Sequence, residues 1–253
     1  MLYLLQELFI NNWRVLRIFK SIMLRASVAF MIAFLFMLIL GKPFIAWLKK
    51  KKYGDTAREE GPKSHFDKSG TPTMGGLLII GAILFATAIA GNFTNKFIVF
   101  LFVITILFTT IGFYDDYLKL TKHKKGLSGK KKILGQLIIT ALTFGFVYKF
   151  GLVSKTIDFS IINPLIKNSY LYITPILFFI FVAFVIIGSS NAVNLTDGLD
   201  GLVSGPTIVV SITLLIITYL TGNVKYAKYL NLYYVPQAAE MIVYLASVIG
   251  ALI

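Results

Sequence analysis

The sequence is marked first by what it lacks: cysteine, acidic residues and charge in general. None of its 253 residues is cysteine, which excludes both a disulfide framework and a metal site built on thiolates. Charged residues make up 14% of the chain, whereas a soluble domain carries roughly 25%. Long apolar runs alternate with short charged stretches, so lipid is expected to cover most of the apolar side chains.

The few charges are mainly of one sign. Twenty-five Lys and Arg residues stand against eleven Asp and Glu residues, which gives a formal net charge of +14. In a soluble protein that excess would suggest nucleic-acid binding. Here most of the basic residues lie between apolar runs, so membrane topology and anionic ligands explain them better, and we expect no nucleic-acid partner.

Apolar residues make up 57% of the chain and gather in runs about as long as a membrane-crossing helix. Backbone polar groups cannot be left open in lipid, so each run is predicted to be a helix. The runs cover Ile22–Leu40, Met74–Ala90, Phe97–Tyr114, Ile133–Phe150, Leu171–Gly188, Leu202–Leu220 and Ala238–Ile253. The predicted fold is therefore all-α: a polytopic integral membrane protein with about seven transmembrane helices, which form one transmembrane domain over residues 1–253.

The basic residues predict the orientation of these helices. Gly41–Thr73 and Asp115–Lys132 together hold 15 of the 25 Lys and Arg residues, and both follow odd-numbered helices. By the positive-inside rule both segments are cytoplasmic, which places the N-terminus outside. Ser189–Gly201 falls on the same cytoplasmic side but has no Lys or Arg; it holds Asp197 and Asp200 instead. A segment that ignores the charge bias is expected to serve a function.

The remaining segments give weaker signals. Residues 1–21 are predicted to form an amphipathic helix at the membrane surface. The external segment Gly151–Tyr170 combines alternating β-branched residues with an Asn163-Pro164 turn, which favours a short β-hairpin. The last apolar run stops at Ile253 without a polar flank, so we expect the chain to be truncated at its C-terminus.

Two adjacent acids, Asp115 and Asp116, directly follow an apolar run. Adjacent carboxylates raise each other's pKa unless a cation neutralises them, and acids next to lipid are costly without a partner. The pair is therefore a candidate site for a divalent metal or for acid–base chemistry. The alternative is that the pair only ends one helix and caps the next.

A second motif has a period of three residues. Asn191, Asn194, Asp197 and Asp200 would lie on roughly one face of a helix. Gly198 and Gly201 would allow a ligand to approach closely. The alternative is an ordinary turn rich in Asn, Asp and Gly, which explains the composition but not the spacing.

Two basic segments could bind phosphate. Gly61–Gly76 leads into a predicted helix, and a helix N-terminus with lysines nearby attracts anions. An ordinary loop-to-helix junction is the alternative, and a lone His65 is more often solvated than a ligand. Thr121–Lys132 is a basic run that, taken alone, reads better as a membrane anchor. Carboxylates, amides and lysines thus come from three segments that are predicted to be cytoplasmic: Gly41–Thr73, Asp115–Lys132 and Ser189–Gly201. Together they could bind a polyanionic phosphate ligand through a metal at the lipid boundary.

An ion-coupled transporter or channel is the competing interpretation. Transporters place carboxylates near the middle of the membrane, within broken helices. Here the acids lie at helix ends on one side, and Arg25 and Glu240 also lie near the ends of predicted helices. This distribution favours chemistry at the membrane surface.

Three blocks, Gly61–Gly76, Asp115–Lys119 and Asn191–Leu202, together resemble the phospho-N-acetylmuramoyl-pentapeptide-transferase family. The last block is shared with the wider polyprenyl-phosphate N-acetylhexosamine-1-phosphate transferase superfamily. The Gly-Thr-Pro-Thr-Met-Gly-Gly sequence at residues 70–76 points to the muramoyl-pentapeptide branch. A sister enzyme that uses UDP-GlcNAc is the near alternative.

The resemblance implies a reaction and its setting. Phospho-MurNAc-pentapeptide would move from UDP-MurNAc-pentapeptide to undecaprenyl phosphate, giving lipid I and UMP in peptidoglycan synthesis, with Mg²⁺ required. The family has ten transmembrane helices, usually forms homodimers and works at the cytoplasmic face of the bacterial cell membrane. One proposal for the family has an acidic-pair Asp deprotonate the lipid phosphate, and another makes an Asp a covalent nucleophile.

The resemblance also assigns roles to residues. The implied catalytic residues are Asp115, Asp116, Asp197, Lys68 and Lys119. The implied substrate-binding residues are Asn191, Asn194, Asp200, Lys132, Gly75, Gly76, Thr73 and His65. The metal ligands implied within this chain are Asp115, Asp116 and Asp197. The family has a further metal-binding Asp and a His-rich loop after its seventh helix, which are expected beyond residue 253 and put the activity of this chain by itself in question.

Overall fold

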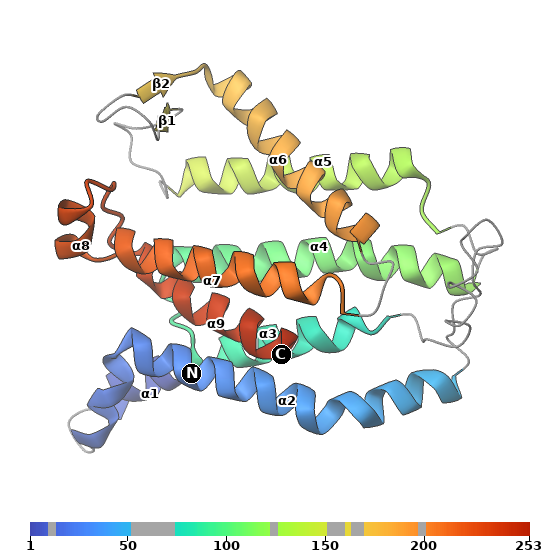
Figure 1. The fold of residues 1–253 in the computed structure, drawn as a ribbon, viewed down its shortest axis with the longest axis horizontal. Coiled ribbons are helices and arrows are strands. Elements are labelled where there is room, and N and C mark those ends of the chain that lie inside the picture. The colour runs from blue at the N-terminus through green and yellow to red at the C-terminus, as the bar shows by residue number, and fades with distance from the viewer. Residues whose placement is uncertain (10–13, 52–73, 122–125, 151–159, 163–169, 197–200) are drawn as a thin grey trace. The chain divides into compact units, whose positions relative to one another are not determined.

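The computed structural model describes residues 1–9, 14–51, 74–121, 126–150, 160–162, 170–196 and 201–253. These residues form two compact units: unit 1 holds Met1–Leu127 and Ser204–Ile253, and unit 2 holds Ser128–Val203. Figure 1 shows the order of the helices and strands along the chain. Each unit is described by itself.

Unit 1 is built from helices. In chain order they are α1 (Leu2–Phe9), the 3-10 helix η1 (Arg14–Lys20), α2 (Ile22–Lys50), α3 (Gly76–Ala90), α4 (Lys96–Thr121), α7 (Ser204–Thr221), α8 (Val224–Tyr229), the 3-10 helix η3 (Ala238–Glu240) and α9 (Met241–Leu252). Unit 2 holds α5 (Gly129–Lys149), α6 (Pro175–Thr196), and the strands β1 (Ser160–Ile162) and β2 (Tyr170–Tyr172).

Among the described residues, five helices are long and apolar enough to cross a membrane: α2, α4, α5, α6 and α7. The apolar segments Gly76–Ala90 and Ala238–Leu252 are shorter. Each predicted apolar run therefore overlaps a helical segment, and the predicted all-α polytopic membrane fold is confirmed. The single-domain organisation stays a prediction.

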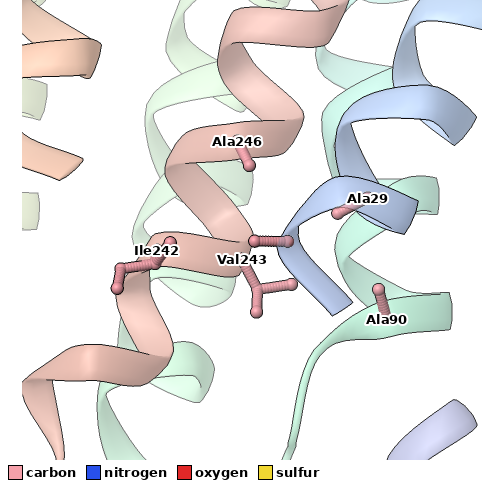
Figure 2. Packing of buried hydrophobic residues seen from close by; sticks show 6 residues of the cluster. Ala29, Ala90, Ile242, Val243 and Ala246 are labelled. Carbon is pink, nitrogen blue, oxygen red and sulfur yellow. The ribbon is translucent and has the colours of Figure 1, made fainter. Parts of the chain in front are cut away.

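Small side chains let the helices of unit 1 pack closely. Figure 2 shows Val243 and Ala246 of α9 beside Ala29 of α2 and Ala90 of α3, and all four are buried. A Cβ atom at Gly250 would collide with the main-chain carbonyl of Phe30, so α9 can approach α2 only with glycine there. In lipid, where apolar surface gains little from association, such close packing is a main source of helix–helix affinity.

Polar side chains also join the helices of unit 1. Arg25 of α2 makes two contacts with Glu240 of η3, at 2.8 Å from Nη1 to Oε2 and 2.5 Å from Nη2 to Oε1. Both residues are buried. Thr87 and Ser247 share a 3.0 Å hydrogen bond between α3 and α9. Each bond satisfies polar groups that would be costly to leave unpaired in an apolar surrounding.

Three helices extend past the apolar runs that predicted them. The apolar runs predicted helix ends near Leu40, Tyr114 and Gly188, but α2 continues to Lys50, α4 to Thr121 and α6 to Thr196. These three boundary predictions are wrong because hydropathy marks only the part of a helix that lipid can cover. The intrahelical hydrogen bonds of the backbone continue into polar turns.

The predicted strand pair is present, but β2 runs to Tyr172, so it includes the first two residues of the run Leu171–Gly188 that was predicted to be helical. β1 and β2 are antiparallel, with Ser160 opposite Tyr172 and Ile162 opposite Tyr170. The Asn163-Pro164 turn lies outside the described residues. At the N-terminus, the Met1 amine donates a 3.0 Å hydrogen bond to the carbonyl of Ala88 on α3. The location of residues 1–21 at a membrane surface stays a prediction.

Candidate functional site

Asp115, Asp116 and Lys119 form a cluster near the end of α4, here called the α4 acidic cluster. The two acids lie six and five residues before the last residue of the helix, Thr121, so neither ends it. The next helix, α5, has Ser128 at its N-cap position. The alternative reading, that the acids end one helix and cap the next, is therefore wrong.

Lysine bridges the two carboxylates of this cluster. Lys119 Nζ lies 2.9 Å from Asp115 Oδ2 and 3.0 Å from Asp116 Oδ1. Side chains three and four residues apart in a helix are neighbours, so the helix itself brings the ammonium group to both acids. Its positive charge offsets the repulsion between the two adjacent carboxylates. The sequence alone did not show which cation would neutralise them.

Asp115 is held by a second contact as well. Its Oδ1 atom accepts a 2.7 Å hydrogen bond from the main-chain N–H of Leu127, and the residue is buried at 7% exposure. Gly126 allows this contact, because it has φ +59° and a Cβ atom there would lie 2.7 Å from Asp115 Oδ1. Sequence reasoning named Gly126 only as part of a basic run. The only available signal was a glycine in the middle of that run, between two groups of lysines.

Asp116 is more open than Asp115. Its side chain is 32% exposed, compared with 11% for that of Asp115. Within the described residues, no hydrogen bond or ion pair reaches its Oδ2 atom, so this oxygen is available to a cation or a proton. Of the two acids, Asp116 is therefore the better placed to contact a ligand.

Two of the three predicted metal ligands, Asp115 and Asp116, lie among the described residues. The described residues contain no group of three or more His, Cys, Asp or Glu side chains that could hold a metal ion. The third predicted ligand, Asp197, lies outside the described residues. The open Oδ2 atom of Asp116 fits a hard cation such as Mg²⁺, which prefers carboxylate oxygens. The magnesium site therefore stays a prediction.

An apolar cavity of about 440 Å³ lies in unit 1, among residues of α2, α3 and α4. Phe113, Tyr117 and Leu120 of α4 line it, so they alternate along the same helix with the residues of the α4 acidic cluster. From α2 and α3 it is lined by residues that include Phe36, Trp47, Leu77 and Gly81. One stretch of α4 thus carries both an ionic cluster and the wall of an apolar cavity.

Unit 2 carries the predicted asparagines. Asn191 and Asn194 both lie in the last turns of α6, so their spacing of three places them on one face of that helix. The alternative reading as a turn is wrong for residues 191–196. Asp197 and Asp200 lie outside the described residues.

A hydrogen-bond network fixes Asn191. Its Nδ2 atom donates to Gln136 Oε1 of α5 and to the carbonyl of Ile187, both at 2.8 Å. Gln136 Nε2 donates to Ser190 Oγ at 3.1 Å, and Gln136 is buried at 1% exposure. Sequence reasoning missed Gln136, because a single glutamine in an apolar run shows no partner in the sequence.

The other predicted residues are only partly described. Lys132 lies in the first turn of α5 and is partly buried, whereas Lys130 and Lys131 are exposed. The predicted helix start at Gly75-Gly76 is confirmed, since Gly75 caps α3, although a Cβ atom at either position would meet no neighbouring atom. The remaining predicted site residues in this region lie outside the described residues: His65, Lys68 and Thr73.

Two family models match the chain. The model for glycosyl transferase family 4 matches residues 97–247, which include all of α4 except its first residue and both asparagines of α6. The phospho-N-acetylmuramoyl-pentapeptide-transferase signature 1 matches residues 68–80. The two matches cover all three blocks that carried the resemblance, at least in part.

Curated relatives are similar along almost the whole chain. A phospho-N-acetylmuramoyl-pentapeptide-transferase of Fusobacterium nucleatum is 45% identical over 252 residues, covering 99% of this chain and 68% of the relative. Proteins of the same name from Thermodesulfovibrio yellowstonii and Francisella tularensis are each 40% identical. The matches cover 93% and 99% of this chain and 65% and 69% of those relatives. The chain thus spans about two thirds of the length of these proteins.

Proposed function

The chain belongs to the phospho-N-acetylmuramoyl-pentapeptide-transferase family, and from this premise we propose that it acts in the transfer of phospho-MurNAc-pentapeptide from UDP-MurNAc-pentapeptide to undecaprenyl phosphate. The products are lipid I and UMP. The observation that best supports the proposal is the α4 acidic cluster, in which Lys119 joins two carboxylates beside an apolar cavity. A lipid phosphate has a charged head and an apolar chain, and this stretch of α4 presents both an ionic cluster and an apolar wall.

The two acids have different parts in the proposed reaction. Asp115 is engaged through both oxygens, by Leu127 and by Lys119, so it orients the cluster. Asp116 has an open oxygen, and it either takes the proton of the lipid phosphate or attacks the donor as a nucleophile. Lys119 stabilises the negative charge that develops on phosphate oxygens in the transition state.

Magnesium is the proposed cofactor. Asp115, Asp116 and Asp197 would hold it, and when bound it would neutralise the charge on the donor's diphosphate and on the UMP that leaves. Asn191, Asn194, Asp200 and Lys132 bind the donor in this proposal, together with the residues of the segment before α3: His65, Lys68, Thr73, Gly75 and Gly76. A helix N-terminus such as that of α3 supports this part, because its free N–H groups attract phosphate.

The proposed setting is the bacterial cell membrane, with the site at its cytoplasmic face, the N-terminus outside and a homodimer as the assembly. The basic residues of Gly41–Thr73 and Asp115–Lys132 support this orientation. The apolar cavity supports a lipid acceptor, since a mainly apolar lining can accept an isoprenoid chain and leaves few polar groups without partners.

A donor assay tests the function directly. The full-length protein that contains this chain is purified in detergent and given UDP-MurNAc-pentapeptide, undecaprenyl phosphate and Mg²⁺, and release of UMP and formation of lipid I are measured. We expect both products, and none when Mg²⁺ is chelated. Faster turnover of UDP-GlcNAc would favour the sister enzyme. Ion movement in vesicles without any UMP release would favour the transporter.

A further inference from the structure

Gln136 is a buried polar side chain that the proposed reaction does not use. It lies on α5, two turns after the first residue of the helix, and is 1% exposed. An amide in an apolar surrounding costs free energy unless its N–H and C=O groups find partners. Gln136 finds both partners on α6: its Oε1 accepts from Asn191 and its Nε2 donates to Ser190.

These bonds determine which way the Asn191 amide faces. A free asparagine amide can present either its NH₂ or its oxygen, which are similar in size. The main-chain carbonyl of Ile187 can only accept, so the atom 2.8 Å from it must be Nδ2. Gln136 Oε1 takes a second hydrogen bond from the same nitrogen.

The orientation leaves Asn191 with one available group. Both N–H bonds of its amide are directed at protein acceptors, and within the described residues no hydrogen bond reaches its Oδ1 atom. Asn191 is partly exposed, so a ligand can reach that oxygen. The side chain is thereby restricted to accepting hydrogen bonds.

We propose that Gln136 is a positioning residue, which holds Asn191 so that its Oδ1 atom accepts a hydrogen bond from an N–H or O–H group of the nucleotide-sugar substrate. The identity of the ligand rests on the proposed function, whereas the pairing of the two amides rests on the contacts alone. Gln136 itself touches no substrate, and it acts by removing the alternative orientation of Asn191.

Three variants on one helix test the role of Gln136. Gln136→Leu keeps the size but loses both bonds, and Gln136→Glu in its protonated form keeps an acceptor for Asn191 and a donor for Ser190. Thr143→Val is the matched control, because Thr143 is buried on α5 and, among the described residues, its hydroxyl bonds only to the carbonyl of Ile139. All three are compared with wild type in detergent, for thermal stability and for binding of UDP-MurNAc-pentapeptide by calorimetry.

Loss of one positioned hydrogen bond is worth about tenfold in affinity. We expect Gln136→Leu to raise the Kd for the donor about tenfold, and Gln136→Glu and Thr143→Val to stay within about threefold of wild type. In the background of Asn191→Ala, Gln136→Leu should cause no further loss. A loss of the same size in that background, or wild-type binding by Gln136→Leu, would overturn the positioning role.

A spectroscopic measurement separates this inference from the proposed function. With asparagine labelled by ¹⁵N, the two Nδ2 protons of Asn191, identified by their absence in Asn191→Ala, should exchange slowly with solvent. Exchange should become fast in Gln136→Leu but not in Thr143→Val. If wild type shows this signature but binds no donor, the proposed function fails and the pairing stands. Fast exchange in wild type overturns the pairing itself.

Discussion

At the scale of single residues, the α4 acidic cluster shows how two adjacent aspartates can differ in burial, in contacts and therefore in proposed role. Asp115 and Asp116 are adjacent in sequence, yet one is buried with both oxygens engaged and the other keeps an open oxygen. The difference comes from the chain after the helix, where Leu127 turns back to donate to Asp115. The sequence predicted the pair as a site but could not divide the roles.

Replacing Asp116 with Asn should lower the rate of transfer at least about a hundredfold, the scale for one charged group that acts in the transition state. Asn keeps the shape of the side chain, so expression and thermal stability should stay near those of wild type. The rate of UMP release by the purified variant measures the effect. Thr110→Val on the same helix is the control, and near-normal turnover by Asp116→Asn would remove Asp116 from the site.

Gly126→Ala should disturb the cluster although it replaces no charged residue. A non-glycine residue in the left-handed region costs about 1–2 kcal/mol, and the added methyl group would also press on Asp115. We therefore expect a lower melting temperature and a slower reaction. Gly129→Ala is the matched control, since a Cβ atom there meets no neighbouring atom. Equal behaviour of the two variants would contradict the role given to Gly126.

At the scale of helices and strands, hydropathy predicted where helices lie but not where they end. The apolar runs located the helices because lipid selects apolar side chains. The ends were missed at α2, α4 and α6, where polar turns continue the helix. For α6 the continuation matters, because it makes the three-residue spacing of Asn191 and Asn194 a helical face.

Side-chain contacts between different helices could not be predicted from the sequence. Arg25 and Glu240 are 215 residues apart, and each looked like an ordinary charge near the end of an apolar run. Gln136 and Asn191 are 55 residues apart and lie on different helices. Side-chain pairing over such separations depends on how helices pack, and periodicity within one segment carries no information about it.

The ion pair between α2 and η3 should contribute strongly to stability. Arg25→Met would leave Glu240 buried without its cation, and removing one partner of a buried pair costs about 3–5 kcal/mol. Thermal unfolding in detergent should show a large fall for Arg25→Met. The double variant Arg25→Met with Glu240→Leu should recover much of the loss, because neither charge is then left unpaired. A double variant less stable than Arg25→Met would contradict this explanation.

Close packing of α9 on α2 makes a separate prediction. Gly250→Ala places a methyl group against the carbonyl of Phe30, and overpacking of this kind costs about 1–3 kcal/mol. We expect a lower melting temperature for this variant in detergent. Gly145→Ala on α5, where the space is open, should behave like wild type. An unchanged melting temperature for Gly250→Ala would show that the two helices can separate at no cost.

At the scale of the whole molecule, the proposed function requires that residues far apart in the chain serve one surface of the membrane. The distribution of basic residues predicts this arrangement, and family membership supports the function that would need it. The α4 acidic cluster and the asparagines of α6 belong to different compact units. Their common exposure to the cytoplasm is therefore the central claim.

The absence of cysteine makes that claim directly measurable, because each introduced cysteine is the only one in the chain. Asp116→Cys, Asn194→Cys and, as an external control, Tyr172→Cys of β2 are treated in intact cells with a maleimide that cannot cross the membrane. The account predicts that only Tyr172→Cys reacts in cells, and that Asp116→Cys and Asn194→Cys both react in inverted vesicles. Labelling of Asp116→Cys and Asn194→Cys from opposite sides would contradict it.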